Sequence, residues 1–242
     1  MNWGKGTKKA ELTTQQIVTL IILIISFVVI LFLLFRLDLG KETSAQLCHN
    51  SVLQRGGASL AKDAIPLQCE REYICITSDG TCEQMVKPEK VRVKTKEELF
   101  GVLADKMARC WWMFGEGKVD YVGKTFVRKN LCSICSQIAF DDSVKETLGI
   151  SEVNKDELYE YLREKNYSES ESYLEYLFGT NDLEALKSRI INSNSSLEGT
   201  PSFGTFSLDK QVFVVMGIVS EPVSYTHLRA HETSLISYAV FS

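Results

Sequence analysis

The chain has 242 residues, a formal net charge of -4 and 24% charged side chains. That length accommodates one modest folded domain, and the absence of a basic excess excludes the electrostatic signature of a nucleic-acid-binding protein. Two further features of the sequence indicate the class of protein: one long apolar stretch and seven cysteines.

The residues from Ile17 to Phe35 carry no charge, and only Thr19 and Ser26 among them are polar. As a helix, a stretch of this length rises about 29 Å, close to the ~30 Å hydrocarbon core of a bilayer. Both hydroxyls can bond to a carbonyl of the preceding turn. The sequence therefore predicts a transmembrane helix, with the lipid bilayer as the partner of this stretch.

The predicted helix is interpreted as an uncleaved signal anchor. Its apolar region exceeds the roughly 7 to 15 residues of a cleavable signal, and no small-residue cleavage site follows it. Lys5, Lys8 and Lys9 precede it. The positive-inside rule then places the N-terminus in the cytoplasm and the C-terminal domain outside, in a single-pass protein of the cell membrane.

All seven cysteines lie within an 88-residue window behind this anchor. In an oxidising exterior, that density indicates a disulfide framework. Because the number of cysteines is odd, one of them has no partner within the chain, and the sequence does not determine how the other six are paired. The disulfide candidates are Cys48, Cys69, Cys75, Cys82, Cys110, Cys132 and Cys135.

Strand geometry bears on one possible disulfide, between Cys75 and Cys82, which are close together in the sequence. Residues 70–77 and 82–86 are predicted to form two strands of a hairpin around Ser78, Asp79 and Gly80. A two-residue turn would leave Cys75 and Cys82 on a diagonal roughly 7 Å apart, whereas a four-residue loop places them opposite each other. The longer loop is favoured, with Gly80 at positive φ.

A helix is predicted to begin after Thr95, because Thr95 and Glu98 have the spacing of a capping box, and to end at Gly115. Its apolar positions recur at helical spacing, which predicts one buried face. Trp112 falls outside that face, so it is predicted either to lie at a partner surface or to shield the Cys110 side chain. The buried face is expected to contain Leu99, Val102, Leu103, Met107, Cys110, Trp111 and Phe114.

Cys132 and Cys135 form a Cys-x-x-Cys motif. A redox-active motif places its first cysteine at a helix N-terminus after a strand, and residues 126–130 are a candidate strand. The motif is weak without that context, and no second one completes a four-cysteine zinc site. Structural disulfides, between the two cysteines or with Cys110 and an upstream cysteine, are favoured. No catalytic, cofactor-binding or metal-binding residue is predicted.

The part of the chain after Cys135 is predicted to be helical and polar. Helices are expected after the cap Asn154 to about residue 165, over 170–179, and from 180 or 181 to about 192, followed by a strand over 211–219. Asp141 and Asp142 make a poor calcium site and fit a helix N-cap equally well.

The charge is unevenly distributed along the exterior region. Residues 85–130 carry eleven Lys or Arg against six Asp or Glu, whereas residues 141–200 carry six against fourteen. This contrast predicts two oppositely charged, solvated faces of one domain.

The end of the chain, from Val223 to Ser234, closely resembles the peptide obtained when a sequencing adapter is translated at the end of an assembled read. Residues 223–242 are therefore interpreted as an artefactual tail, and the natural chain is expected to continue past about Pro222. His227 and His231 belong to this tail, so their helical spacing is not interpreted as a zinc site.

Residues 48–52, 65–69, 104–117 and 131–135 resemble segments of a family of uncharacterised, Cys-rich, single-pass membrane proteins from small-genome archaeal assemblies. The resemblance covers roughly residues 10 to 220. It implies no known chemistry, and only that the anchor and the cysteine-rich domain belong together.

The sequence thus predicts an α+β protein in which one N-terminal transmembrane helix precedes a disulfide-stapled extracytoplasmic α+β domain with a helical C-terminal cover. The expected function is binding or structural organisation at the cell surface, through an unknown protein or surface partner, and not catalysis. Two alternatives stay open: a pilin-like filament subunit, suggested by Lys9-Ala10-Glu11, and a membrane-tethered thiol-disulfide oxidoreductase using Cys132 and Cys135. The predicted segments are 1–16 (cytoplasmic N-terminus), 17–36 (signal anchor), 37–140 (cysteine-rich α+β region), 141–222 (acidic helical region plus a strand of the same domain) and 223–242 (tail).

Overall fold

The computed structural model describes residues 14–36, 39–58, 62–122, 129–192, 202–220, 235–236 and 240–241. The chain forms two compact units, Met1–Thr43 and Ser44–Ser242. The predictions for residues 1–13, for the candidate strand residues up to 128 and for most of the tail lie outside the described residues. The elements are α1 (Thr14–Arg36), α2 (Leu39–Gly57), a short 3-10 helix (Lys62–Ala64), β1 (Glu72–Thr77), β2 (Glu89–Arg92), α3 (Lys96–Met113), β3 (Lys129–Phe140), α4 (Asp142–Leu148), β4 (Glu152–Asn154), α5 (Lys155–Glu164), α6 (Tyr173–Phe178), α7 (Leu183–Asn192), β5 (Thr205–Ser207), β6 (Val212–Ser220), β7 (Leu235–Ile236) and β8 (Val240–Phe241).

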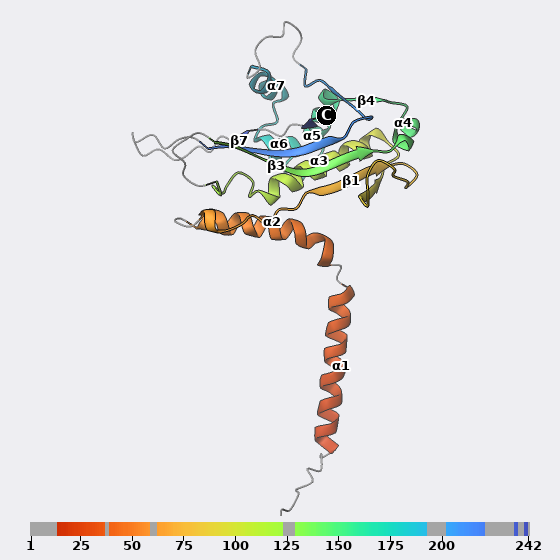
Figure 1. Cartoon of the computed structure of the whole chain (residues 1–242), viewed down its shortest axis with the longest axis vertical. Coiled ribbons are helices and arrows are strands. Elements are labelled where there is room, and N and C mark those ends of the chain that lie inside the picture. Colours follow the sequence, from red (N-terminus) through yellow and green to blue (C-terminus); the bar gives the residue numbers. More distant parts are fainter. Residues whose placement is uncertain are drawn as a thin grey trace, which may run out of the picture. The chain divides into compact units, whose positions relative to one another are not determined.

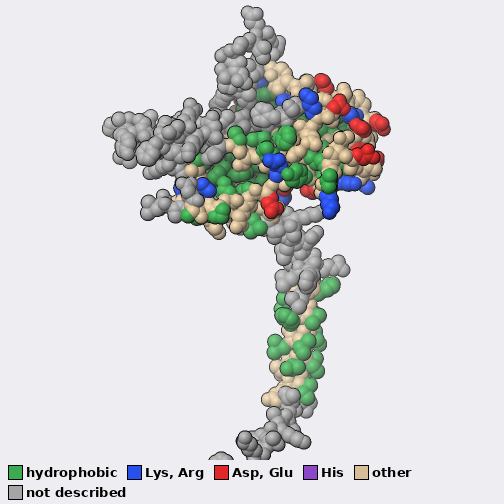
Figure 2. Space-filling view, in the orientation of Figure 1, with side chains coloured by type: hydrophobic (Ala, Val, Ile, Leu, Met, Phe, Trp, Pro, Cys, Tyr) green, Lys and Arg blue, Asp and Glu red, His purple; other side chains and the backbone are tan. Residues whose placement is uncertain are grey.

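The first unit contains α1, whose large apolar side chains are exposed by 45–64% from Ile17 onward. Figure 2 shows these hydrophobic side chains along the helix. Thr19 and Ser26 donate to the carbonyl oxygens of Gln15 and Leu23, each at 2.9 Å, as the sequence predicts. Among the described residues, no helix is both long enough and apolar enough to cross a membrane.

The second unit is built on a six-stranded sheet in the order β2-β1-β3-β6, with β7 and β8 both pairing with β6 (Figure 1). Strand β1 pairs in parallel with β2 and with β3, whereas β3 and β6 are antiparallel. A second, two-stranded sheet joins β4 and β5. The α+β class and the strands near 70–77 and 211–219 are therefore confirmed.

Helices cover one face of the large sheet. Helix α3 packs on β3 and β6 with Leu99, Leu103 and Met107 buried, and α5 and α6 pack against α3. The predicted cap is present, because the Thr95 hydroxyl accepts from the N–H of Glu98 at 3.1 Å. The face that α3 covers therefore forms the main hydrophobic core.

The caps of the C-terminal helices explain where these helices begin. Asn154 accepts from the N–H of Asp156 at 2.9 Å and caps α5, as predicted, and Asp141 caps α4. Helix α6 begins later than predicted because Ser172 is its N-cap. The Ser172 hydroxyl accepts a hydrogen bond from the N–H of Glu175 in the first turn of the helix. Together these helices form the expected helical cover.

Substitutions on the two faces of β3 test which face is buried. Ile138 is fully buried, whereas Ile134 on the same strand is 37% exposed. We expect Ile138→Ala to lower the free energy of unfolding by roughly 2–5 kcal/mol. Ile134→Ala should lower it by less than about 1 kcal/mol. Chemical denaturation of the two variants checks this difference, and equal losses would contradict the assignment of the faces.

Candidate functional site

The two faces of the sheet differ because side chains alternate along each strand. Ile74 and Ile138 are cross-strand neighbours that face α3 and are fully buried. The next pair, Tyr73 and Gln137, points to the opposite side together with Phe213, which pairs with Gln137. Tyr73 keeps 50% of its surface exposed there. The sheet therefore has a second face with large side chains in contact with solvent.

Apolar side chains from three strands gather on this second face. We call it the open face and define it by Tyr73, Cys132, Ile134, Phe213 and Val215. Ile134 and Val215 are cross-strand neighbours, and Cys132 is exposed two residues before Ile134. Figure 2 shows hydrophobic side chains over the sheet in this view. A contiguous apolar patch of this kind typically marks an interaction surface.

The parallel pairing of β1 makes an uncovered face unusual. Parallel sheets occur almost only where both faces are covered. Among the described residues, helices α3, α5 and α6 lie on one side of the sheet, behind it in Figure 1. On the open face, the disulfide loop of residues 75–82 covers the end of β1, where Cys75 is fully buried. Over the rest of the open face, the described residues supply no second layer.

The cations of β1, β2 and α3 are distributed unequally between the two faces. On the α3 side, Glu72 accepts from Lys106 at 3.0 Å and forms an ion pair with Arg109, whose Nε lies 2.9 Å away, and Glu89 lies 3.5 Å from Lys106. Glu72 and Lys106 are largely shielded from water, and each has an opposite charge beside it. Acidic and basic groups on the helix side therefore neutralise one another.

On the open side of the sheet, basic side chains lie before the start of β1 and on β2 without such partners. We call Arg71, Lys90 and Arg92 the basic rim. Lys90 donates to the carbonyl oxygen of Gly80 at 3.1 Å, and Arg71 donates to the Gln137 side chain at 3.4 Å. In the described part of the chain, no carboxylate forms an ion pair with the basic rim. The rim therefore presents three positive charges that have no direct carboxylate partner in this part of the chain.

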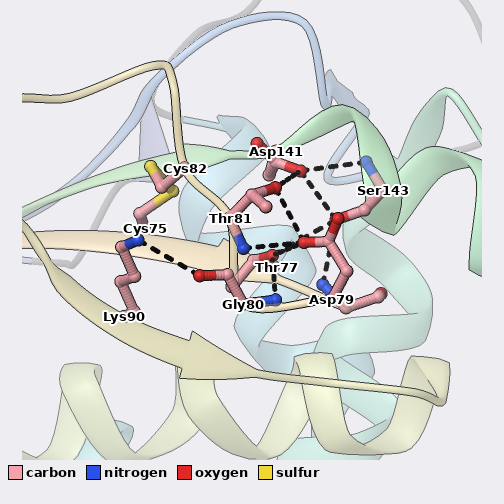
Figure 3. Close-up of a disulfide and its surroundings, with 10 residues drawn as sticks. Cys75, Thr77, Asp79, Gly80, Thr81, Cys82, Lys90, Asp141 and Ser143 are labelled. Carbon is pink, nitrogen blue, oxygen red and sulfur yellow. Dashed lines mark hydrogen bonds between the residues drawn. A yellow bond between two sulfur atoms is a disulfide. The ribbon is translucent and has the colours of Figure 1, made fainter.

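The disulfide loop beside the rim corrects the predicted hairpin. Cys75 and Cys82 are bonded, with Cα atoms 6.4 Å apart, and Gly80 has φ +95, as predicted. Residues 82–86 form no strand, however, and the neighbour of β1 is β2, which runs parallel to it. The disulfide and the turn close the loop without a second hairpin strand, because the chain passes over the edge of the sheet before β2 begins (Figure 3).

A hydrogen-bond network holds the disulfide loop (Figure 3). Asp79 accepts from the N–H and the hydroxyl of Thr81, each at 2.7 Å, and from the Thr77 hydroxyl at 3.0 Å. Asp141 accepts from the N–H of Ser143 at 3.1 Å. The Thr81 and Thr77 donors lower the pKa of Asp79 from 3.8 to about 2. These carboxylates therefore accept hydrogen bonds from the loop and from α4, and among the described residues neither forms an ion pair with the basic rim.

The remaining cysteines form two more disulfides. Cys48 is bonded to Cys69 and Cys110 to Cys135, with Cα separations of 4.3 and 5.7 Å. Cys132 is free and exposed. The predicted disulfide framework is confirmed. Of the two alternatives left open for the Cys-x-x-Cys residues, the structure has the bond to Cys110, formed by Cys135, whereas Cys132 bonds to no upstream cysteine. The Cys-x-x-Cys residues lie within β3, away from any helix N-terminus, and are not bonded to each other.

Trp112, the predicted partner-surface residue, lies away from the open face. Its ring stacks on His49 with centroids 4.2 Å apart, and its carbonyl oxygen lies 2.6 Å from His49 Nδ1. His49 belongs to α2, so Trp112 joins α3 to α2. Its role at a partner surface stays a prediction.

A tyrosine cluster on the helix side was missed by sequence reasoning. Tyr176 donates to Glu116 at 2.8 Å, Tyr173 donates to Asp105, and Tyr167 stacks on Tyr176 with centroids 4.0 Å apart. Burial, with help from these carboxylates, raises the pKa of Tyr173 and Tyr176. The Tyr173 hydroxyl therefore attaches α6 to α3, and the Tyr176 hydroxyl attaches α6 to the turn that follows α3. Within the described residues, no three His, Cys, Asp or Glu side chains assemble as metal ligands would.

The open face was also missed, although the sequence contains its signals. The apolar run from Val212 to Met216 in β6 is uninterrupted, which is typical of a strand with apolar groups on both faces. Glu89, Lys90 and Arg92 place opposite charges at alternating positions, which predicts one acidic and one basic side for this strand. No known family model, curated protein or solved structure matches the chain, so the site is defined by its geometry.

The low pKa of Asp79 predicts a specific pH dependence. A carboxylate with a lowered pKa stabilises the folded state above its unfolded value of 3.8, and this contribution is lost as the pH falls toward about 2. We expect Asp79→Asn to flatten the fall of the unfolding temperature over that interval. Thermal unfolding at a series of pH values checks this. Thr81→Ala, which keeps the backbone donor, should show a smaller change, and identical profiles for all three proteins would contradict the assignment.

The disulfide map predicts one reactive thiol. Folded protein kept free of reductant should titrate with Ellman's reagent at a single site, Cys132, because the other six cysteines are bonded. Cys132→Ser should abolish the reaction. Peptide mapping without reduction should recover the three linked pairs. A second reactive thiol, or a Cys132–Cys135 peptide, would contradict the map.

Proposed function

We propose that this protein is a membrane-anchored binding protein whose disulfide-stapled domain lies outside the cytoplasm. The observation that carries the proposal is the open face of the sheet, where no other element of the described chain covers the apolar side chains near the basic rim. A surface of this composition favours a macromolecular partner over a small molecule, because it is broad and faces solvent.

The cysteines support the location. Six of the seven are paired in three disulfides within one domain. Disulfides persist in oxidising compartments and are rare in the cytoplasm, where thiols are kept reduced. The compartment is therefore proposed to be extracytoplasmic, in agreement with the orientation expected from Lys5, Lys8 and Lys9.

Helix α1 supports the anchor. Its exposed side chains include Ile17, Leu23 and Phe27, and apolar groups occur all around the helix. A helix that is hydrophobic on every side is buried either in a large core or in a bilayer. The proposed anchor comprises this helix with the whole apolar stretch from Ile17 to Phe35, which extends beyond its described side chains.

Labelling of intact cells tests the anchor and the location together. A membrane-impermeant maleimide should modify Cys132 in intact cells, and Cys132→Ser should remove the label. Ile24→Arg combined with Phe27→Arg should release the protein from the membrane fraction, since a charge at the bilayer centre costs several kcal/mol. Labelling that appears only after the cells are permeabilised would contradict the extracytoplasmic location.

A further inference from the structure

We propose that the open face binds an acidic amphipathic helix of a partner protein, which completes the missing second layer of the sheet. This inference names the class of partner for the binding function proposed above, and it rests on that function. It follows from the dimensions, the apolar pattern and the charge of the open face.

The width of the open face fits one helix. Its apolar side chains come from β1, β3 and β6, which are three neighbouring strands. At about 4.8 Å between strands, they span roughly 10 Å, close to the 10–12 Å diameter of a helix with its side chains. Because β1 is parallel to both of its neighbours, a helix is the element that normally covers such a sheet.

The apolar side chains are spaced for helical anchors. Ile134 and Val215 form one cross-strand row, and Tyr73 and Phe213 flank Gln137 in the next. The two rows are two residues apart along β6, or about 7 Å, little more than one turn of helix. Apolar residues at positions i and i+4 of a partner helix would therefore meet successive rows.

The basic rim selects an acidic partner. Arg71 lies beside the apolar rows, where it donates to Gln137, whereas Lys90 and Arg92 lie opposite Cys75 and Thr77, beyond Tyr73 and next to the disulfide loop. All three are exposed, and none forms an ion pair among the described residues. Glu72 and Glu89 of the same strands point to α3, where Lys106 and Arg109 neutralise them. A helix with Asp or Glu beside its apolar stripe would supply the missing negative charge.

Two other occupants fit less well. The chain's own acidic helices already use their apolar side chains on the opposite side of the sheet, where Leu158 of α5, Leu174 of α6 and Leu186 of α7 are buried. A second copy would bring an identical open face with the same basic rim, and would add positive charge to the interface instead of the negative charge that the rim favours.

Binding of two synthetic peptides to the full chain tests the proposal. The probe is a fluorescein-labelled helical peptide with Leu on one stripe and Glu elsewhere, and its counterpart carries Lys in place of Glu. The protein is held in nanodiscs of neutral phosphatidylcholine, and empty nanodiscs report lipid binding. We expect saturable anisotropy changes with the Leu/Glu peptide, at least about tenfold tighter than with the Leu/Lys peptide, which corresponds to ~1.4 kcal/mol.

Charge reversal on the rim should invert this preference. The double variant Lys90→Glu with Arg92→Glu should bind the Leu/Glu peptide at least about tenfold more weakly and the Leu/Lys peptide more tightly. The matched control, Arg163→Glu with Lys165→Glu at the end of α5, makes the same change in net charge and should leave the preference unaltered. A bulky maleimide on Cys132, which lies on the open face, should block the Leu/Glu peptide.

Three outcomes would overturn the proposal. These are equal binding of the two peptides, an unchanged preference in the Lys90→Glu, Arg92→Glu variant, and self-association of the protein that Tyr73→Ser abolishes, since the last result would assign the face to a second copy. Labelling of Cys132 in intact cells separates the two levels of inference. Accessible Cys132 without peptide binding overturns the partner class alone, whereas Cys132 that is labelled only after the cells are permeabilised overturns the proposed location.

Discussion

Strand β3 is the element on which the rest of the second unit depends. It pairs in parallel with β1 and antiparallel with β6, and a bulge between Ile134 and Ser136 interrupts its second pairing. At that bulge Cys135 is buried and bonded to Cys110 of α3. Because a bulge shifts the alternation of side chains, Ile134 before it faces away from α3 while Cys135 and Ser136 after it are buried. The same strand therefore attaches the helical layer and presents the open face.

The features that sequence reasoning predicted correctly depend on residues close together in the chain. The capping box of Thr95, the positive φ of Gly80 and the Cys75–Cys82 disulfide each involve residues within a few positions of one another. Short-range chemistry determines such features, so a single sequence contains enough information to predict them. The same holds for the helical cover, where caps and apolar spacing indicate each helix.

The features that sequence reasoning missed depend on pairing between distant residues. β1 pairs with β3, so that Ile74 lies beside Ile138, and no local signal distinguishes this parallel neighbour from a hairpin partner. The Cys-x-x-Cys motif illustrates the same limit. Its spacing is identical whether Cys132 and Cys135 bond to each other or, as in the structure, a bulge buries one against α3 and leaves the other exposed. The open face was missed for this reason, since it exists only once the strands are in register.

The open face combines two interactions that act over different distances. Charges on the basic rim are screened within about 8 Å at physiological ionic strength, so Arg71, Lys90 and Arg92 select a partner only once it is near the surface. Exposed ion pairs also contribute little free energy individually. Removal of the apolar side chains of Tyr73, Ile134, Phe213 and Val215 from water is the larger contribution, but it is not directional. A partner is therefore held by the apolar rows and oriented by the rim. Because Arg71 precedes β1, and Lys90 and Arg92 belong to β2, the rim lies toward the edge of the sheet opposite β6. A helix with carboxylates along one flank then has a single preferred direction across the sheet.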